Sequence, residues 1–209
     1  MDHEQFKLKS VQGDGRGAVK DKLPSADRIR HAAKDLFATN GFHQTSMSEL
    51  AAAADMSVGL IYRSFKSKAE IIEAIVHADF DEKIADLERI RQRLGTGEIT
   101  IEKSIEELFL HAMRDSDEAL SFDILAEGSR NERVGQTIGK MCERLRSYLR
   151  GFALAANPSL AGDQLEGAAE LMLGCMFGLG HRRLAMPRLD ASQTAEQSAR
   201  MMVAALRAL

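Results

Sequence analysis

The chain has 209 residues, 44% hydrophobic and 28% charged, an ordinary composition for a folded protein of one domain or two small ones. A net charge of -3 argues against a protein that coats nucleic acid, although a sequence-specific binder needs only a local basic surface. No apolar run reaches the length of a membrane span and the N-terminus has no secretion-signal pattern, so we expect a cytoplasmic protein without membrane association.

The composition predicts an all-α fold of about nine helices, because Ala, Leu, Met, Glu and Arg are plentiful and proline occurs only three times. The two cysteines, Cys142 and Cys175, form no CxxC pair and have no histidine at metal-ligand spacing. We therefore expect no metal site and no cofactor, and we interpret both thiols as inert core residues.

Residues 1–23 lack apolar periodicity and contain three glycines among scattered charges, which predicts a flexible N-terminal arm. Its basic residues either follow a phosphate backbone or belong to a solvated tail. Structure begins near Pro24, where we expect Ser25 to be the N-cap of a helix. An apolar stripe at helical spacing follows, up to a terminating glycine at Gly41.

Two short helices come next. Ser46 and Glu49 fit a capping box that starts a helix ending near Ala53. After a turn at Asp55, Ser57 caps a second helix that runs to about Phe65. The two helices and the tight turn between them form a helix-turn-helix over about 46–65, whose second helix exposes its outer positions to a DNA major groove.

A second capping box at residues 67–70 opens a long helix that we place at 68–94. Apolar spacing predicts five further helices beyond it, at about 100–114, 117–128, 131–156, 163–185 and 191–209. No HExxH, phosphate loop or nucleophile elbow occurs, so we do not expect an enzyme.

Three runs, 28–42, 45–51 and 57–70, resemble the first four helices of the TetR/AcrR repressors. The most specific part is a Gly-x-x-Tyr-x-x-Phe-x-x-Lys signature that starts at Gly59, and the resemblance covers about 45 contiguous residues. It implies a DNA-binding domain at 24–70 and a C-terminal domain at 71–209 for regulation and dimerisation. The implied function is that of a homodimeric repressor bound to a palindromic double-stranded DNA operator and released by a small-molecule effector. The alternative is a helical adaptor of the same fold that binds protein instead of DNA.

The resemblance also implies which residues contact DNA. Phosphate contacts are expected from Thr45, Ser46, Tyr62 and Lys68, and base contacts from Ser57, Val58, Gly59 and Arg63. Lys66 adds to the basic surface, since no acidic residue occurs from Ser57 to Ala69. Two positions depart from the family pattern: Asp55 replaces the usual turn glycine, and Ser64 replaces a larger residue that supplies a phosphate contact.

The C-terminal domain carries weaker signals. Small residues around Gly174 and Gly178 indicate either a dimer interface built by 163–185 and 191–208, as the resemblance implies, or close packing within one subunit. Seven of the ten methionines lie at or after Met113, and methionine suits adaptable pockets as well as ordinary cores. The candidate effector-pocket residues are Phe109, Met113, Phe122, Leu125, Met141, Cys142, Met172, Met176 and Phe177. His111 and His181 are possible polar anchors.

Overall fold

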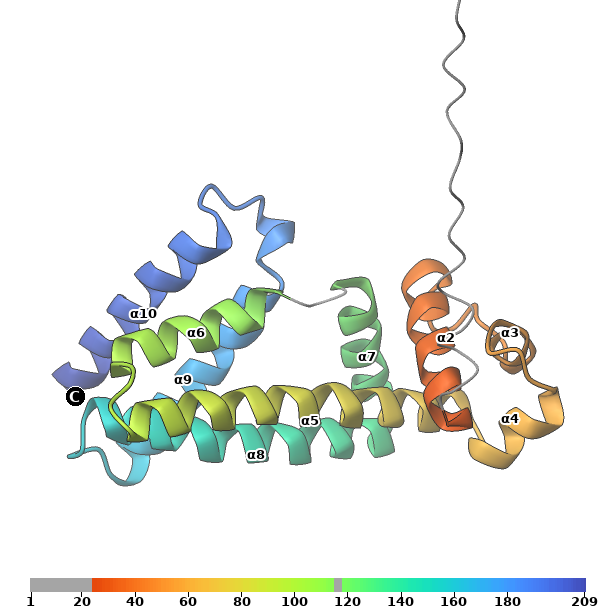
Figure 1. The fold of residues 1–209 in the computed structure, drawn as a ribbon, viewed down its shortest axis with the longest axis horizontal. Helices are drawn as coiled ribbons and strands as arrows, with labels where there is room; N and C mark the ends of the chain where they lie inside the picture. The colour runs from red at the N-terminus through yellow and green to blue at the C-terminus, as the bar shows by residue number, and fades with distance from the viewer. Residues whose placement is uncertain (1–23, 115–117) are drawn as a thin grey trace, which may run out of the picture.

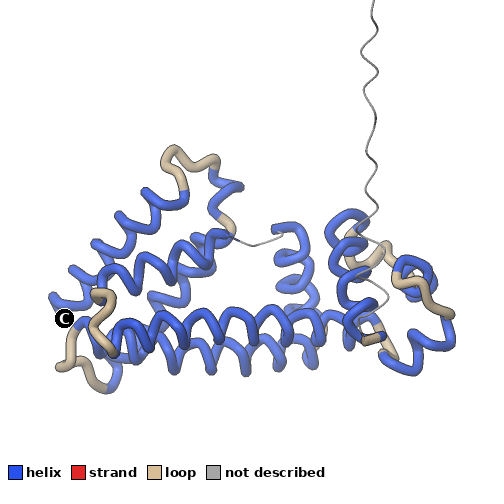
Figure 2. Tube along the Cα trace, in the orientation of Figure 1, coloured by secondary structure: helices blue, strands red, loops and turns tan. Residues whose placement is uncertain are grey.

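The structure is a computed structural model that describes residues 24–114 and 118–209 (Figure 1). Within these ranges the chain forms nine α-helices and one short 3-10 helix, η1, which confirms the predicted all-α fold (Figure 2). The elements are α2 (Ser25–Asn40), α3 (Met47–Ala53), α4 (Val58–Ser64), α5 (Lys68–Gly95), α6 (Ile101–Arg114), α7 (Glu118–Arg130), α8 (Glu132–Ala156), α9 (Gly162–Gly180), η1 (Arg182–Ala185) and α10 (Ala191–Ala208). The predicted N-terminal arm lies outside the described residues.

Two long helices, α5 and α8, lie side by side and form the long axis of the molecule (Figure 1). The 28 residues of α5 span about 42 Å at 1.5 Å per residue. Helices α2, α3 and α4 gather at the N-terminal end of α5, whereas α6, α9 and α10 pack at the other end. Helix α7 contacts both α8 and α2, between the two groups. We call residues 24–75 the head and helices α6 to α10 the body.

The head has its own hydrophobic core. Phe37, Leu50 and Ile61, from three different helices, are each at most 1% exposed. Leu120 of α7 and Val134 of α8 also belong to this cluster. The core of the head is therefore not confined to the predicted 24–70 domain, because the body supplies two of its buried side chains.

A second core fills the body, where α6 packs against α9 and α10 and α8 packs against α9. Phe109, Phe152 and Met172 are at most 1% exposed within it. Burying a side chain of this size contributes about 1.5–3 kcal/mol. Cys142 and Cys175 are free thiols packed against this core, and burial raises the pKa of both, in keeping with unreactive structural residues.

The helix starts agree with most of the predicted caps. The Ser46 hydroxyl accepts from the N–H of Glu49 at 3.2 Å, and the Glu49 carboxylate accepts from the N–H of Ser46 at 2.7 Å, which completes the predicted capping box. The hydroxyl of Ser57 accepts from the N–H of Leu60 and caps α4 as expected. These local bonds fix where both helices of the helix-turn-helix begin.

Two predicted caps were wrong in detail. Ser25 is the first residue of α2, and Pro24 occupies the N-cap position without a side-chain bond. At the start of α5 the Ser67 hydroxyl accepts from the N–H of Glu70 as predicted, but the Glu70 carboxylate accepts from the N–H of Lys66 at 2.7 Å. The carboxylate therefore reaches one residue beyond the N-cap, and the reciprocal half of the second capping box is not formed.

The predicted helix at 163–185 is interrupted. Helix α9 ends at Gly180, and a separate 3-10 turn, η1, follows. The turn ends at Met186, whose φ of 48° is left-handed, just before the helix-breaking Pro187.

Among the described residues, no helix is long and apolar enough to cross a membrane, and no group of three or more potential metal ligands occurs.

Candidate DNA-binding surface

The turn between α3 and α4 sets the geometry of the surface. Asp55 has a φ of 53°, which confirms that the turn requires a left-handed residue. A guanidinium nitrogen of Arg28, on α2, donates to the carbonyls of Ala54 at 2.6 Å and of Asp55 at 2.9 Å. The same nitrogen lies 3.8 Å from the exposed Asp55 carboxylate. Arg28 therefore caps the end of α3 and locks the turn onto α2.

Helix α4 presents a defined outer face. Ile61 is fully buried and marks the inward direction of the helix. Gly59 and Arg63 lie two residues to either side of it, so at about 100° per residue they point about 160° away from the core. Leu60 and Tyr62 flank this outer face, and all four residues are exposed. Figure 1 shows α4 at the end of the molecule farthest from the body.

Packing within the chain does not explain why a glycine occupies position 59 on this exposed face. A Cβ built on Gly59 would meet nothing within 4 Å, so the protein itself does not demand glycine there. Val58 and Tyr62 keep 44% and 45% of their surface exposed, although both are large residues. An open glycine between exposed large side chains is suited to close approach by a partner.

The structure limits which groups are available for the two predicted phosphate contacts at the start of α3. Thr45 is only 1% exposed and its hydroxyl donates to the carbonyl of Gly41 at 3.0 Å, so this hydroxyl is not available to a phosphate. The N–H of Ser46 is engaged by Glu49. The exposed Ser46 hydroxyl accepts its capping bond and keeps its own proton for donation.

The two lysines predicted to contact DNA, Lys66 and Lys68, are not equally exposed cations. The Lys68 ammonium donates to the carbonyls of Phe42 at 2.6 Å and His43 at 3.2 Å, and it lies 4.6 Å from the centre of the Phe42 ring. Burial lowers the pKa of Lys68. Lys68 is therefore anchored to the loop after α2, while Arg63 and Lys66 lie on the exposed surface. Lys66 donates to the carbonyl of Tyr62 at 2.9 Å.

Sequence reasoning missed two residues of this surface. Leu60 is 37% exposed beside Gly59 and Arg63, and a helical projection centred on Ile61 identifies it. Arg28 was noted only as part of the family-like run, since its partners lie 26 and 27 residues away and no local pattern announces them.

The predicted effector-pocket residues differ in burial and surroundings. Phe109, Met113 and Met172 are core residues of the body, and Met141 is also buried. Cys142 and Met176 pack against that core, Leu125 is half-buried, and Phe122 and Phe177 are exposed. The fully buried Phe109 and Met172 fill space between helices, so their surfaces are already covered by neighbouring side chains.

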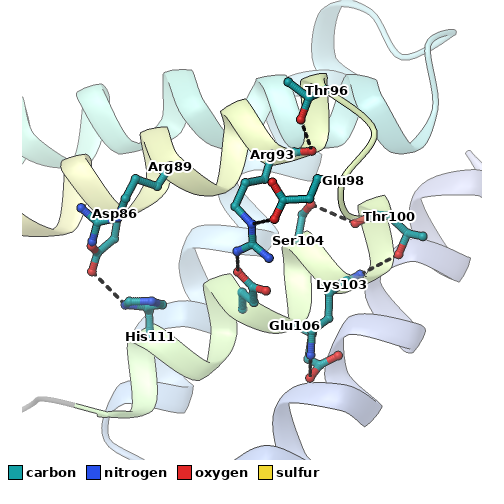
Figure 3. Close-up of polar contacts among 11 residues, drawn as sticks. Asp86, Arg89, Arg93, Thr96, Glu98, Thr100, Lys103, Ser104, Glu106 and His111 are labelled. Atoms are coloured by element: carbon teal, nitrogen blue, oxygen red, sulfur yellow. Dashed lines mark hydrogen bonds and ion pairs between the residues drawn. The ribbon is translucent and has the colours of Figure 1, made fainter.

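The two histidines noted in the sequence link helices to one another. The ring of His181 lies 3.0 Å from the Ser121 hydroxyl, 2.8 Å from the Phe177 carbonyl and 4.5 Å, centroid to centroid, from the ring of Phe122. His111 lies 3.0 Å from the Asp86 carboxylate and joins α6 to α5 (Figure 3). His181 therefore contacts both of the exposed predicted pocket residues, Phe122 and Phe177.

Polar contacts also fix α6 against the end of α5, as Figure 3 shows. The Arg93 guanidinium pairs with Glu98 at 2.8 Å and with Glu107 at 2.7 Å, and these hydrogen bonds raise its pKa. Arg93 lies in the last turn of α5, at the end of the helix opposite the head (Figure 1), so its ion pairs fix that end of α5.

Comparison with known proteins finds matches among bacterial transcriptional regulators. Residues 29–75 match the family described as bacterial regulatory proteins, tetR family. The HTH-type transcriptional regulator UidR of Escherichia coli strain K12 is 33% identical to the chain over 111 residues, 53% of this chain and 55% of UidR. The match thus spans about half the length of these curated relatives.

Two solved structures share the fold over nearly the whole chain. Salmonella enterica GusR has 28% identity and a TM-score of 0.65, and the match covers 90% of this chain and 98% of GusR. AibR, solved in complex with isovaleryl coenzyme A and operator DNA, has 18% identity and a TM-score of 0.64, with 85% and 97% of the two chains covered.

The chain shares with these two structures an N-terminal helix-turn-helix joined through one long helix to an all-helical body. The helix-turn-helix region, residues 29–75, matches the TetR family of bacterial regulatory proteins, which agrees with the resemblance found in the sequence.

Proposed function

We propose that the protein is a sequence-specific DNA-binding repressor that acts as a homodimer and leaves its operator when a small molecule binds the body. The outward face of α4 is the observation that carries this proposal. Gly59 and Arg63 point away from a buried Ile61, and no acidic residue lies between Ser57 and Ala69. Such a surface suits a polyanion read in its major groove.

Within this proposal the contacts divide into two kinds. Ser57, Val58, Gly59 and Arg63 face base edges, and the Arg63 guanidinium is suited to bidentate bonds with guanine. Phosphates are held by the hydroxyls of Ser46 and Tyr62 and by Lys66. The contribution of Thr45 is limited to its backbone. Lys68 acts mainly by holding the loop before α3, although its ammonium has a third proton for a phosphate.

A dimer through α9 and α10 is supported by the outer faces of these helices. Leu171 and Met201 are 54% and 69% exposed, and a shallow groove of about 230 Å³ between the two helices is lined mainly by apolar residues. A Cβ on Gly174 or Gly178 would meet nothing within 4 Å, so these glycines do not serve packing within one subunit. An exposed apolar face with open glycines fits the close approach of a second copy.

Release follows from the geometry of two linked heads. A dimer reaches successive major grooves only when its recognition helices lie roughly 34–36 Å apart. An effector that shifts the body helices changes this spacing and lowers affinity without touching DNA. AibR was solved with both an acyl coenzyme A and operator DNA. For this chain we place the effector near Phe122, Phe177 and His181, where α7 meets the end of α9.

The DNA-binding proposal is tested by selecting bound DNA from random oligonucleotides and then footprinting the selected site. Tyr62→Phe removes only the hydroxyl and is expected to weaken specific binding about two- to tenfold, the range for one hydrogen bond. Tyr148→Phe makes the same change on α8 and is the matched control. Equal protection by both variants contradicts the Tyr62 contact, and failure to select any DNA favours the protein-binding adaptor.

The dimer is tested separately by sedimentation. Leu171→Glu places a charge on the α9 face and is expected to yield monomers, because a buried unpaired carboxylate is unfavourable. Leu154→Glu is the matched control, since Leu154 is an exposed leucine of α8 at 38%. A Leu171→Glu protein that remains dimeric would place the interface elsewhere.

A further inference from the structure

One side of α7 faces the head. Asp123, Glu127 and Arg130 recur at spacings of four and three residues, so they lie along one face of the helix. Leu120, three residues before Asp123, lies on the same face and is buried in the core of the head. This face therefore meets the loop that joins α2 to α3.

The central contact is made by a carboxylate. The Asp123 Oδ2 atom accepts from the backbone N–H of Phe42 at 2.9 Å, a bond between residues 81 positions apart. Phe42 is only 6% exposed, so its N–H needs a partner within the protein. The preceding Gly41 has a φ of 82°, and the chain leaves α2 there in a conformation that favours glycine.

The opposite side of the same loop is held by α5. The Lys68 ammonium donates to the carbonyls of Phe42 and His43, whereas the Asp123 carboxylate on α7 accepts from the N–H of Phe42. The guanidinium of Arg130 lies 3.5 Å from the His43 ring. The loop is therefore clamped between two helices three residues before Ser46, which starts α3.

We propose that Asp123 is a positioning residue for DNA binding, which fixes the start of the helix-turn-helix relative to the body. The inference rests on the proposed function. Loss of the bond frees the Phe42 amide and loosens the loop, so the surface of α3 and α4 samples more orientations and binds DNA less tightly.

The placement of α7 gives this contact a link to the rest of the body. Ser121 and Phe122, which lie between the head-facing residues Leu120 and Asp123 in sequence, contact His181 at the end of α9. At the other end of α7, a Cβ on Gly135 of α8 would lie 2.7 Å from the carbonyl oxygen of Gly128. Helix α7 thus touches the loop, α8 and the end of α9, and a shift of α7 changes the geometry at Asp123.

The test compares Asp123→Ala, which removes the acceptor, with Asp123→Asn, which keeps a carbonyl oxygen at the same place. We expect the alanine variant to bind the selected operator about three- to tenfold more weakly, and the amide of Phe42 to exchange faster by a similar factor. The asparagine variant is expected to stay within about twofold of the unmodified protein in both measurements. Rescue by asparagine distinguishes the hydrogen bond from the negative charge.

Glu82→Ala is the matched control, because it removes a carboxylate from an exposed position of α5. If Asp123→Ala binds as tightly as the unmodified protein, or if asparagine weakens binding as much as alanine, the inference is overturned while the proposed function stands. If the unmodified protein selects no DNA, both fall. Should the alanine variant not fold, Asp123→Ser replaces it, since its hydroxyl is too short to reach the amide.

Discussion

The head and the body expose surfaces of opposite character. On the head, α4 presents the backbone of Gly59 and the cation of Arg63 in a stretch free of acids. On the body, α9 and α10 present Leu171 and Met201, which are large and apolar. The first surface fits a charged polymer with an ordered pattern of donors and acceptors, and the second fits another apolar protein face. Under the proposed function, this difference predicts that DNA recognition and self-association belong to separate parts of one chain and can be altered one at a time.

The strongest test of this separation removes a core side chain from each region. Phe37 is 1% exposed and packs edge-on against Phe42, with ring centroids 5.3 Å apart. Phe37→Ala is expected to lower the free energy of unfolding by about 3–5 kcal/mol and to abolish operator binding while the dimer persists. Phe109→Ala is the counterpart in the body and is expected to weaken the dimer as well. Urea unfolding and sedimentation of both variants check this, and identical behaviour would show that head and body unfold as one unit.

A smaller effect is expected from the turn of the helix-turn-helix. Arg28→Ala removes charge-assisted bonds to the carbonyls of Ala54 and Asp55, which contribute about 1.5–3 kcal/mol when the donor is charged. Operator affinity should fall and the dimer should not change. Arg30→Ala is the control, because Arg30 pairs with Asp27 within the same helix. Equal affinities of the two variants would show that the turn keeps its shape without Arg28.

A third prediction tests which apolar residues of α4 contact DNA bases. Val58 and Leu60 are exposed apolar residues beside Gly59, and apolar side chains in the major groove contact the methyl group of thymine. Replacing a contacted thymine of the selected operator by deoxyuracil should weaken binding about three- to fourfold, the value of one buried methyl. Binding by the Leu60→Ala variant should respond less to that replacement. An unchanged response would leave Leu60 outside the base-reading set.

The smallest expected effect is the pH dependence of the head's thermal stability. The hydrogen bond from the N–H of Ser46 holds the pKa of Glu49 below its ordinary value of 4.5. A carboxylate with a lowered pKa in the folded state contributes stability above pH 4.5 and loses it as the pH falls through the lowered value. Thermal unfolding of the head should therefore distinguish the unmodified protein from Glu49→Gln above pH 4.5 but progressively less below it. A difference independent of pH would contradict a role for the ionised capping box.

The sequence predicted the head better than the body because the head depends on local signals. The Ser46 capping box, the left-handed Asp55 and the exposed Tyr62 all follow from residues within a few positions. Apart from the caps at Ser25 and Glu70, the differences in the head concern partners distant along the chain or hidden by packing. Lys68 bonds to a loop 25 and 26 residues away, and the hydroxyl of Thr45 is satisfied inside the protein.

The body offered no such local signals for function. Methionine and phenylalanine at apolar helix positions have the same pattern whether they fill a core or line a pocket, so Phe109 and Met172 could not be distinguished from Phe122 and Phe177. The glycines of α9 were ambiguous for the same reason. Only the arrangement of neighbouring helices shows that Gly174 and Gly178 face open space.

The contact between Gly128 and Gly135 has a consequence for how such a protein can diversify. A side chain at Gly135 would collide with the backbone carbonyl oxygen of Gly128 at 2.7 Å, whereas one at Gly128 would meet the Cδ1 atom of the Ile138 side chain at 2.6 Å. At Gly135, therefore, the joint between α7 and α8 does not tolerate a larger residue unless the backbone moves. If the body senses an effector as proposed, responses to other effectors are expected to arise through residues on either side of Gly135, with the packing of α7 on α8 retained.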